Sequence, residues 1–456
     1  MKLFVNFDAT GIEVTDNTAQ TSGEKEVLDQ ILSPERIILN YSDENHAVFY
    51  SDFGTYFWTN AKSIFSQEVI GDSPKLENMP ISDYIELKNQ RSITYKFSSP
   101  LPLLVFFMSN GEEQPKNFLS NQTSVSEFTI SMDSNFFIAL KTGETYYKWT
   151  PDNYDKRQLE AEFEQMKDRE YVKYRNGGII AASKEVLIPL NLDETQTNVF
   201  VSNDMDLNDR VHIEEIVQKF FGSIEKTRKI EENDGTLIYM SNAKGLVFSN
   251  DGVVKYFDEI KSPVKTRDLQ ASLKTYAGFI ANKDYLPSNL YLAEIQPIQN
   301  GDDKGYRFNF GYKINNKKVI LDDAFNKSLE YPVEVEVYND YIKTYKRYYR
   351  KTSSLDRMDS FTFSIDYIMK PLDIMERHID LFRRNYMKEH LLTEEQMLAV
   401  QNTEVLAEMR DINSAYYDYC ENKDDAKLVE VWIIALGKTT YIFDAYSGNL
   451  LRQFKE

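Results

Sequence analysis

Two apolar periodicities follow one another in residues 204–258, DMDLNDRVHIEEIVQKFFGSIEKTRKIEENDGTLIYMSNAKGLVFSNDGVVKYFD. The first part has apolar side chains three and four positions apart, the spacing of one face of an amphipathic helix: Ile213, Ile216, Val217, Phe220 and Phe221. After Gly222 the spacing becomes two, which is typical of short strands, here at 236–240, 246–248 and 253–257. The Asn-Asp-Gly triplets at 233–235 and 250–252 tolerate the positive φ of tight hairpin turns. These residues therefore predict a helix packed on a small antiparallel meander.

The residues before this meander predict a mixed domain of helices and strands. Short apolar or alternating runs bounded by turn residues predict strands at 36–41, 47–50, 56–58, 92–97, 103–108, 126–130 and 135–140. Helices are predicted at 61–70, 81–90 and 154–171. Further strands at 186–192 and 198–201 lead into the helix that opens the meander.

The residues after the meander repeat the combination of helices and antiparallel strands. Helices are predicted at 269–280, 372–386 and 394–413, the last capped by Thr393, and strands at 290–298, 306–312, 333–337, 341–349, 360–367, 428–436 and 439–445. A chain of 456 residues is too long for a single core. The sequence therefore predicts an α+β protein of three domains: a mixed N-terminal domain at 1–185 and two related helix-on-antiparallel-sheet domains at 186–315 and 316–456.

The composition narrows the classes of partner. Lys and Arg number 53 and Asp and Glu 72, so the formal charge is −19, which disfavours nucleic acid and anionic lipid as ligands. Cys420 is the single cysteine, so neither an intrachain disulfide nor a multi-cysteine metal site is expected. Residues 1–6 do not form a signal peptide, and the apolar runs are shorter than the roughly 20 residues of a membrane span. The chain as printed is expected to be soluble.

Acidic residues and histidines give no strong signal for a catalytic or metal site. Asp204, Asp206, Asn208 and Glu215 have the spacing of a calcium loop, but Asp209 stands where the sharp turn requires glycine, and helix capping explains the acids equally well. The histidines, which lack metal-site spacing, are His46, His212, His378 and His390. Motifs of serine hydrolases, nucleotide hydrolases and dinucleotide enzymes are absent from the sequence. We therefore predict no catalytic, cofactor-binding or metal-binding residue, and leave open a hydrolase whose carboxylates meet only in the folded chain.

Residues 341–351 interleave tyrosines with five basic residues. Such a run could stack nucleic-acid bases, but the net charge disfavours that ligand. On a regular strand, alternate residues share one face: Tyr341, Lys343, Tyr345, Arg347 and Tyr349. Since Tyr and Arg are favoured at protein interfaces, we predict a partner-contact surface made of Tyr341, Tyr345, Arg347 and Tyr349.

Several of these segments resemble the YycH family. The residues that carry the resemblance are Phe220-Phe221-Gly222, 229–239, 245–248 and 252–256, which resemble the central part of YycH proteins. The closing residues 431–434 and 441–448 resemble the same family, its sister YycI, and the strand pair of PepSY-type domains. The resemblance extends in element order over roughly residues 30–456.

The resemblance implies a non-enzymatic accessory regulator of the WalK (YycG) sensor histidine kinase of Gram-positive bacteria. Its implied partners are the kinase and YycI, and its implied place is the outer face of the cytoplasmic membrane, behind an N-terminal transmembrane helix that the printed sequence does not contain. It further implies three domains, the last two related to each other, and neither cofactors nor catalytic residues. The alternative is an extracellular PepSY-like binding or inhibitor module that acts on a peptidase or a cell-wall component.

Overall fold

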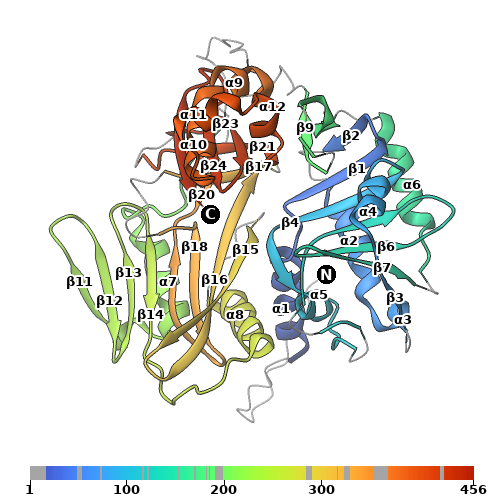
Figure 1. Ribbon diagram of the computed structural model, residues 1–456. Helices are drawn as coiled ribbons and strands as arrows, with labels where there is room; N and C mark the ends of the chain where they lie inside the picture. Colours follow the sequence, from blue (N-terminus) through green and yellow to red (C-terminus); the bar gives the residue numbers. More distant parts are fainter. Residues whose placement is uncertain are drawn as a thin grey trace.

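The computed structural model describes residues 17–48, 54–71, 74–115, 118–120, 123–151, 154–168, 171–180, 182–183, 185–190, 199–283, 290–315, 317–322, 329–352, 368–421 and 426–455. Helices and largely antiparallel sheets are both present, so the predicted α+β class is confirmed (Figure 1). The described strands form two large sheets and a small one, β20-β10-β22, of β10 (Phe200–Asn203), β20 (Arg350–Thr352) and β22 (Ala426–Lys427). Within the described ranges, no helix is both long enough and apolar enough to cross a bilayer.

The first large sheet has nine antiparallel strands in the order β3-β7-β6-β5-β4-β1-β2-β8-β9. Its strands are β1 (Arg36–Ser42), β2 (Asn45–Val48), β3 (Lys75–Asn78), β4 (Ser92–Pro102), β5 (Ser124–Ser131), β6 (Ile138–Thr142), β7 (Thr145–Thr150), β8 (Val172–Asn176) and β9 (Leu187–Pro189). The helices around it are α1 (Asn17–Ile31), α2 (Gly54–Lys62), α3 (Gln67–Ile70), α4 (Ile81–Lys88), α5 (Leu103–Ser109) and α6 (Arg157–Gln165), with short 3-10 turns η1 (Ser63–Phe65), η2 (Met166–Asp168) and η3 (Gly177–Ile180).

The two faces of this sheet differ in chemistry because side chains alternate along each strand. On β4, Ile93 and Tyr95 belong to the aromatic core that α2, α5 and α6 complete, and the ring of Trp58 lies 6.2 Å from that of Tyr95. The other face carries polar side chains such as Thr94, and α4 covers it through Tyr84. A polar cluster is thereby buried beneath α4.

Two segments predicted as strands are helices, so those predictions are wrong. Residues 56–58 lie in α2, and residues 103–108 form most of α5. Both are short continuous apolar runs, whose periodicity cannot distinguish a buried strand from a buried helix. Pro102 ends β4 and precedes the first residue of α5, a position where the missing N–H costs nothing to the helix.

The second large sheet follows the order β11-β12-β13-β14-β19-β18-β16-β17-β21-β23-β24-β25, with β15 paired to β16 beside this path. Only β17 and β21 pair in parallel among its described ladders. Its strands are β11 (Arg228–Glu231), β12 (Leu237–Ser241), β13 (Lys244–Phe248), β14 (Val254–Phe257), β15 (Leu290–Asn300), β16 (Asp303–Ile314), β17 (Lys317–Leu321), β18 (Val333–Tyr338), β19 (Tyr341–Arg347), β21 (Met409–Asp418), β23 (Val429–Leu436), β24 (Thr439–Asp444) and β25 (Leu450–Lys455).

The predicted helix and meander are confirmed. Helix α7 (Arg210–Phe221) begins where the Asp209 carboxylate accepts the His212 N–H and ends at Gly222, whose φ of 77° is left-handed. Its apolar face is buried, and the ring of Phe220 lies 5.3 Å from that of Tyr256 on β14. A 3-10 turn, η4 (Ile224–Lys226), leads to β11, an additional edge strand that the sequence reading did not include.

The second sheet is continuous across the predicted domain limit between residues 315 and 316. Strands β18 and β19, which follow that limit, lie between β14 and β16, which precede it. The strands therefore interleave in space, and the division at 1–185, 186–315 and 316–456 stays a prediction.

Four short helices cover the C-terminal strands: α9 (Pro371–Arg377), α10 (Ile379–Glu389), α11 (Glu394–Ala399) and α12 (Asn402–Leu406). The Thr393 cap is confirmed, because its hydroxyl accepts the Gln396 N–H at 3.2 Å and the Gln396 amide oxygen accepts the Thr393 N–H at 2.8 Å. The predicted helix at 394–413 was too long, since β21 starts at Met409 and pairs with β17 and β23. The predicted strand at 360–367 lies outside the described residues.

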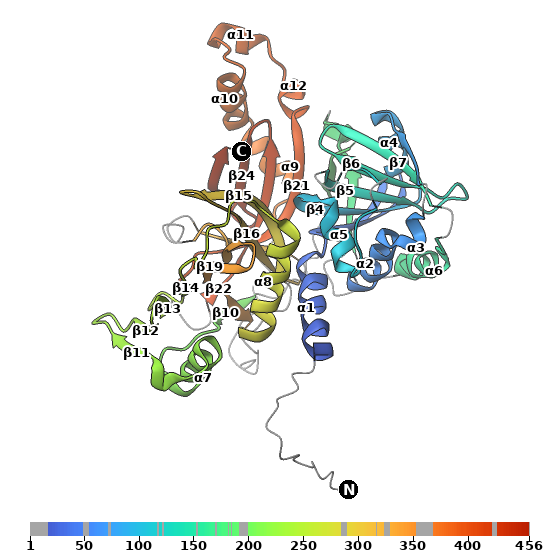
Figure 2. The same cartoon turned by 90° about the horizontal axis from the view of Figure 1, so that it is seen from below.

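Helix α1 lies between the two large sheets (Figure 2). It packs on α8 (Leu269–Lys283) of the second sheet and on α5 of the first. Its apolar residues Val27, Leu28 and Ile31 are buried in a core that extends into both parts of the chain. The contact that α1 makes between the two large sheets is therefore apolar. A second, polar contact joins β1 and β4 of the first sheet to β17 and β21 of the second.

Candidate functional site

The predicted contact residues do not lie together on the surface. Tyr345, Arg347 and Tyr349 are buried, and only Tyr341 is partly exposed. A bulge breaks the alternation, because Thr344 pairs with Glu336 whereas Ile342 pairs with Val337, leaving Lys343 as the extra residue. Tyr341 is thereby turned from the face that Tyr345 occupies.

Each buried member of this run has a partner inside the chain. The ring of Tyr345 lies 5.4 Å from that of Phe279 on α8, and the ring of Tyr349 lies 5.2 Å from that of Tyr312 on β16. The Arg347 guanidinium lies 3.0 Å from the Asp204 carboxylate, with the two side chains 3% and 11% exposed. These residues hold the second sheet together.

The acids with calcium-loop spacing are bound to protein groups. Besides the pair of Asp204 with Arg347, the Asp206 carboxylate accepts the Asn208 N–H at 2.8 Å, and Asp209 caps α7. Glu215 lies 3.8 Å from the His212 ring on the exposed side of the helix. In the described part of the chain, no three His, Cys, Asp or Glu side chains meet as metal ligands would. Capping is observed at Asp209 alone, whereas Asp204 forms an ion pair with Arg347 and Asp206 closes a local turn before the helix.

Histidine and cysteine side chains are likewise engaged structurally. Buried His46 contacts Asn40 at 2.8 Å, and burial lowers its pKa to about 4. The ring of His378 lies 2.7 Å from the Gly448 carbonyl, and that of His390 lies 2.7 Å from the Glu408 carboxylate. Burial and then the nearby Asp418 charge raise the pKa of Cys420 to about 12, so its thiol stays protonated at neutral pH.

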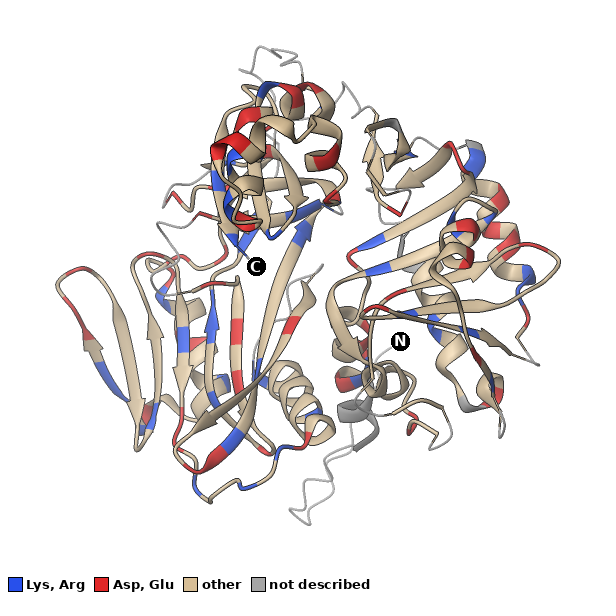
Figure 3. Cartoon of the chain, in the orientation of Figure 1, with Lys and Arg blue, Asp and Glu red and all other residues tan. Residues whose placement is uncertain are grey.

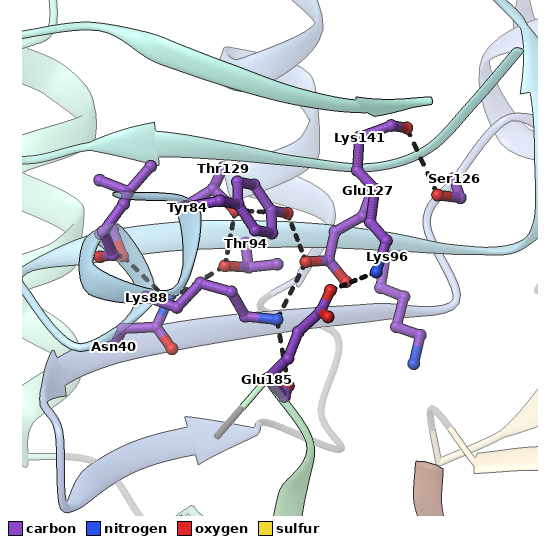
Figure 4. Close-up of polar contacts among 12 residues, drawn as sticks. Asn40, Tyr84, Lys88, Thr94, Lys96, Ser126, Glu127, Thr129, Lys141 and Glu185 are labelled. Carbon is purple, nitrogen blue, oxygen red and sulfur yellow. Dashed lines mark hydrogen bonds and ion pairs between the residues drawn. The ribbon is translucent and has the colours of Figure 1, made fainter. Parts of the chain in front are cut away.

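A buried ionic cluster lies on the polar face of the first sheet, under α4 (Figure 4). The Glu127 carboxylate on β5 accepts the Tyr84 hydroxyl at 2.5 Å and pairs with the Lys88 ammonium at 3.0 Å. The side chains of Lys88 and Glu127 are only 5% and 6% exposed. Lys141 pairs with Glu185 beside them, and Lys88 also donates to the Glu185 carbonyl at 3.4 Å. The cluster fixes α4 and the chain before β9 to the sheet.

The electrostatics of this cluster favour permanent ions. Burial raises the pKa of Glu127, but Lys88, Lys96 and Lys141 lower it by more, to about 2. Burial and the Glu127 charge raise the pKa of Tyr84 well above its usual value. A general acid or base works best with a pKa near the operating pH, and neither group has one. The arrangement is suited to stabilising the fold.

A second cluster joins the two large sheets, and we call it the ionic junction: Glu35, Arg36, Lys96, Lys313, Lys318, Asp411 and Asn413. Arg36 on β1 pairs with Asp411 on β21 at 2.5 Å, and Lys96 on β4 reaches the same carboxylate at 3.2 Å. Glu35, which precedes β1, pairs with Lys318 on β17 at 3.1 Å. Figure 3 shows basic segments at the facing ends of β1, β4 and β17. The junction therefore connects residues nearly the whole chain apart.

Hydrogen bonds complete the junction. The Asn413 amide donates to Glu35 at 3.0 Å, and the Lys313 ammonium donates to the Pro34 carbonyl at 2.6 Å. Burial raises the pKa of Glu35, but Lys318 and Arg36 lower it by more, to about 2. For Lys313, burial lowers the pKa to about 8. Since Lys96 faces both Asp411 and Glu127, the junction and the cluster under α4 form one continuous run of charges.

These lowered carboxyl pKa values predict a loss of stability in acid. Glu35 and Glu127 have folded pKa values of about 2, against an ordinary 4.5, so their stabilisation is complete above about pH 4.5 and is lost as the pH falls towards about 2. We expect the free energy of unfolding to fall by up to about 3 kcal/mol per carboxylate across that window. Urea unfolding followed by tryptophan fluorescence measures it, and E127Q should flatten the pH dependence. Equal urea midpoints at about pH 5 and 2.5 would contradict the assignment.

An open groove of about 530 Å³ lies on the exposed side of α7, lined by Val211, Glu214, Glu215, Gln218, Lys219 and Ile224. Its two carboxylates have separate partners, Lys229 at 4.0 Å from Glu214 and His212 at 3.8 Å from Glu215. A glycosidase-like pair would instead face a common substrate position. The two carboxylates of the groove are therefore not arranged as a catalytic pair.

Sequence reasoning missed the ionic junction. The alternation Ser92, Thr94, Lys96 on β4 signals a buried polar face, and Glu35-Arg36 at the start of β1 signals charge at a strand end. Neither pattern identifies Asp411, which is 375 positions from Arg36. Pairing over that distance depends on the assembled fold.

No protein-family model matches the sequence, and no curated protein matches it. Among solved structures, the chain is similar to YycH from Bacillus subtilis, with a TM-score of 0.54 and 13% sequence identity. The similarity covers 93% of this chain and 96% of that one. At such low identity it concerns the fold, and it agrees with the resemblance carried by residues 220–256 and 431–448. The similarity to the YycH fold therefore extends over 93% of the chain.

Proposed function

We propose that the chain is a non-enzymatic, extracytoplasmic regulator of the sensor histidine kinase WalK (YycG), which acts by protein association together with YycI. The observation that carries the proposal is the fold similarity to YycH over 93% of the chain and 96% of that structure. A match of this extent concerns most of both chains, rather than one common motif. The proposal places the chain on the outer face of the cytoplasmic membrane of a Gram-positive bacterium, behind an N-terminal anchor.

The two internal charged clusters have a structural character, which fits a protein that acts by association. The carboxylates of the ionic junction and of the cluster under α4 are bound to lysine and arginine, and their pKa values are lowered. A regulator that acts by contact must hold its parts in a fixed orientation, and the ionic junction holds the first large sheet against the second. Of the four residues first predicted to contact a partner, Tyr341 is the one that a partner can reach without opening the sheet.

The test is co-purification from a Gram-positive membrane. The full chain is placed behind a single N-terminal membrane helix and expressed with tagged YycI and tagged WalK. We expect each partner to co-purify with it, and kinase autophosphorylation in vesicles to change when the chain is present. An unrelated extracellular domain behind the same helix is the matched control, because it reports association through the anchor alone.

Absence of both partners above that control would contradict the proposal. Binding to purified cell-wall fragments or to a peptidase, without binding to the kinase or YycI, would favour the PepSY-like binding or inhibitor module instead. Turnover of a substrate by the purified chain would contradict the non-enzymatic assignment.

A further inference from the structure

Strand β11 forms an open edge of the second large sheet. In the described part of the chain it pairs with β12 alone, and all four of its residues are exposed. Figures 1 and 2 show β11 and β12 extending away from the body of the molecule. An open edge presents backbone N–H and C=O groups to which another strand can bind.

The pairing with β12 identifies which backbone groups face outwards. The Glu232 N–H donates to the Thr236 carbonyl, so the backbone N–H and C=O groups of Glu232 point towards β12. In an antiparallel pair the direction of these backbone groups alternates from one residue to the next, so those of Ile230 also point towards β12. Lys229 and Glu231 therefore direct their backbone N–H and C=O groups away from the sheet.

The sequence of this edge is complementary to itself in antiparallel pairing. With Ile230 of two copies opposite each other, Lys229 of one copy stands opposite Glu231 of the other, and Arg228 stands opposite Glu232. Every charged residue then meets an opposite charge and the isoleucines meet each other, which is favourable for cross-strand neighbours. Moving the two-fold axis to Lys229 would bring two lysines together.

We propose that two copies of this chain associate through β11, pairing antiparallel about a two-fold axis at Ile230 so that their large sheets become continuous. In this register Lys229 and Glu231 form the hydrogen-bonded pairs, which is the arrangement that their outward-facing backbone groups require. The interface is isologous, as two-fold symmetry requires. This inference does not depend on the proposed function.

Packing on the two sides of the strand fits the proposal. Glu231 pairs with Arg210 at 2.9 Å and Lys229 with Glu214 at 4.0 Å, so the side chains of Lys229 and Glu231 lie towards α7. Ile230, 37% exposed, lies on the opposite face of the sheet. A pair of four-residue strands buries less than the roughly 1,200–2,000 Å² of a stable complex, so the dimer is expected to be weak and dependent on concentration.

Cysteine cross-linking tests the geometry directly. In a C420S background, I230C places two thiols opposite each other in a non-hydrogen-bonded pair, where the Cα atoms lie about 4.5 Å apart, within disulfide range. We expect I230C to form a disulfide-linked dimer at least about tenfold faster than L398C, whose residue on α11 is 84% exposed and lies far from β11. Equal rates would mean random collision and would overturn the proposal.

Charge exchange tests the register. Arg228 and Glu232 are exposed and lie on the face that Ile230 occupies. Added to I230C, R228E should slow cross-linking several-fold, because the new glutamate at position 228 of one copy stands opposite Glu232 of the other. Adding E232R as well restores opposite charges, so R228E/E232R should restore the rate. The double variant should also fail to cross-link with chains that keep Arg228 and Glu232. Equal rates in the single and double variants would overturn this register.

Discussion

Replacing Asp411 by alanine is expected to lower the free energy of unfolding by about 2–4 kcal/mol. Asp411 is the carboxylate that Arg36 meets at 2.5 Å and Lys96 at 3.2 Å. The Arg36 side chain is 4% exposed, so the variant leaves a buried cation without its bonded carboxylate. Since the Asp411 side chain is 29% exposed, water will partly compensate, and the expected loss lies below that of a fully buried pair.

The variant should also loosen one half of the molecule relative to the other. Hydrogen exchange should accelerate in β1 and in the first residues of β21, which the ionic junction connects, and should change little in β24, which lies two strands from β21 in the sheet order. Urea unfolding gives the loss of stability. D155A is the matched control: Asp155 pairs with Arg157, but the two side chains are 58% and 86% exposed, so its removal should leave the midpoint unchanged.

The double variant R36M/D411L separates the loss of a charge partner from the loss of packing. It removes both members of the pair and fills the space with apolar side chains, which is often neutral for stability. We expect it to recover most of the stability that D411A loses. If D411A were as stable as D155A, or if R36M/D411L were no better than D411A, the role assigned to the pair would be incorrect.

Local patterns were enough to predict α7 and the meander that follows it. Both the helical spacing of Ile213, Val217 and Phe220 and the turn residues at Gly235 and Gly252 act over a few positions, and the structure realises them with φ values of 89° and 90° at the two glycines. The fold similarity to YycH agrees with the resemblance that these segments carried.

Features that depend on neighbours distant in sequence were missed. The apolar run of α5 is compatible with a strand until the surrounding aromatic core exists, and the bulge at Lys343 arises from the pairing of β19 with β18. Because of this bulge, the side chains of Tyr341 and Tyr345 lie on different faces of the sheet. The junction of Arg36 with Asp411 likewise requires both sheets to be in place.

Replacing Glu430 by alanine is expected to cost about 3–5 kcal/mol, the largest effect of a single substitution that we expect. Glu430 on β23 pairs with Lys317 on β17, each side chain 2% exposed, and accepts the Ser414 hydroxyl on β21 at 2.9 Å. The variant therefore leaves a buried ammonium without its carboxylate at the parallel ladder of β17 and β21.

Urea unfolding of E430A, with D302A as the exposed-pair control, measures this loss, because Asp302 pairs with Lys265 where the side chains are 88% and 60% exposed. K317M/E430L removes both charges and should recover most of the stability. Unlike D411A, E430A should accelerate hydrogen exchange in β17, β21 and β23 and leave β1 unchanged, since Glu430 contacts the second sheet alone among the described partners. Equal acceleration in β1 for both variants would show that the junction and the C-terminal strands unfold as one unit. A loss below about 1 kcal/mol would instead mean that water reaches Lys317 once the carboxylate is removed.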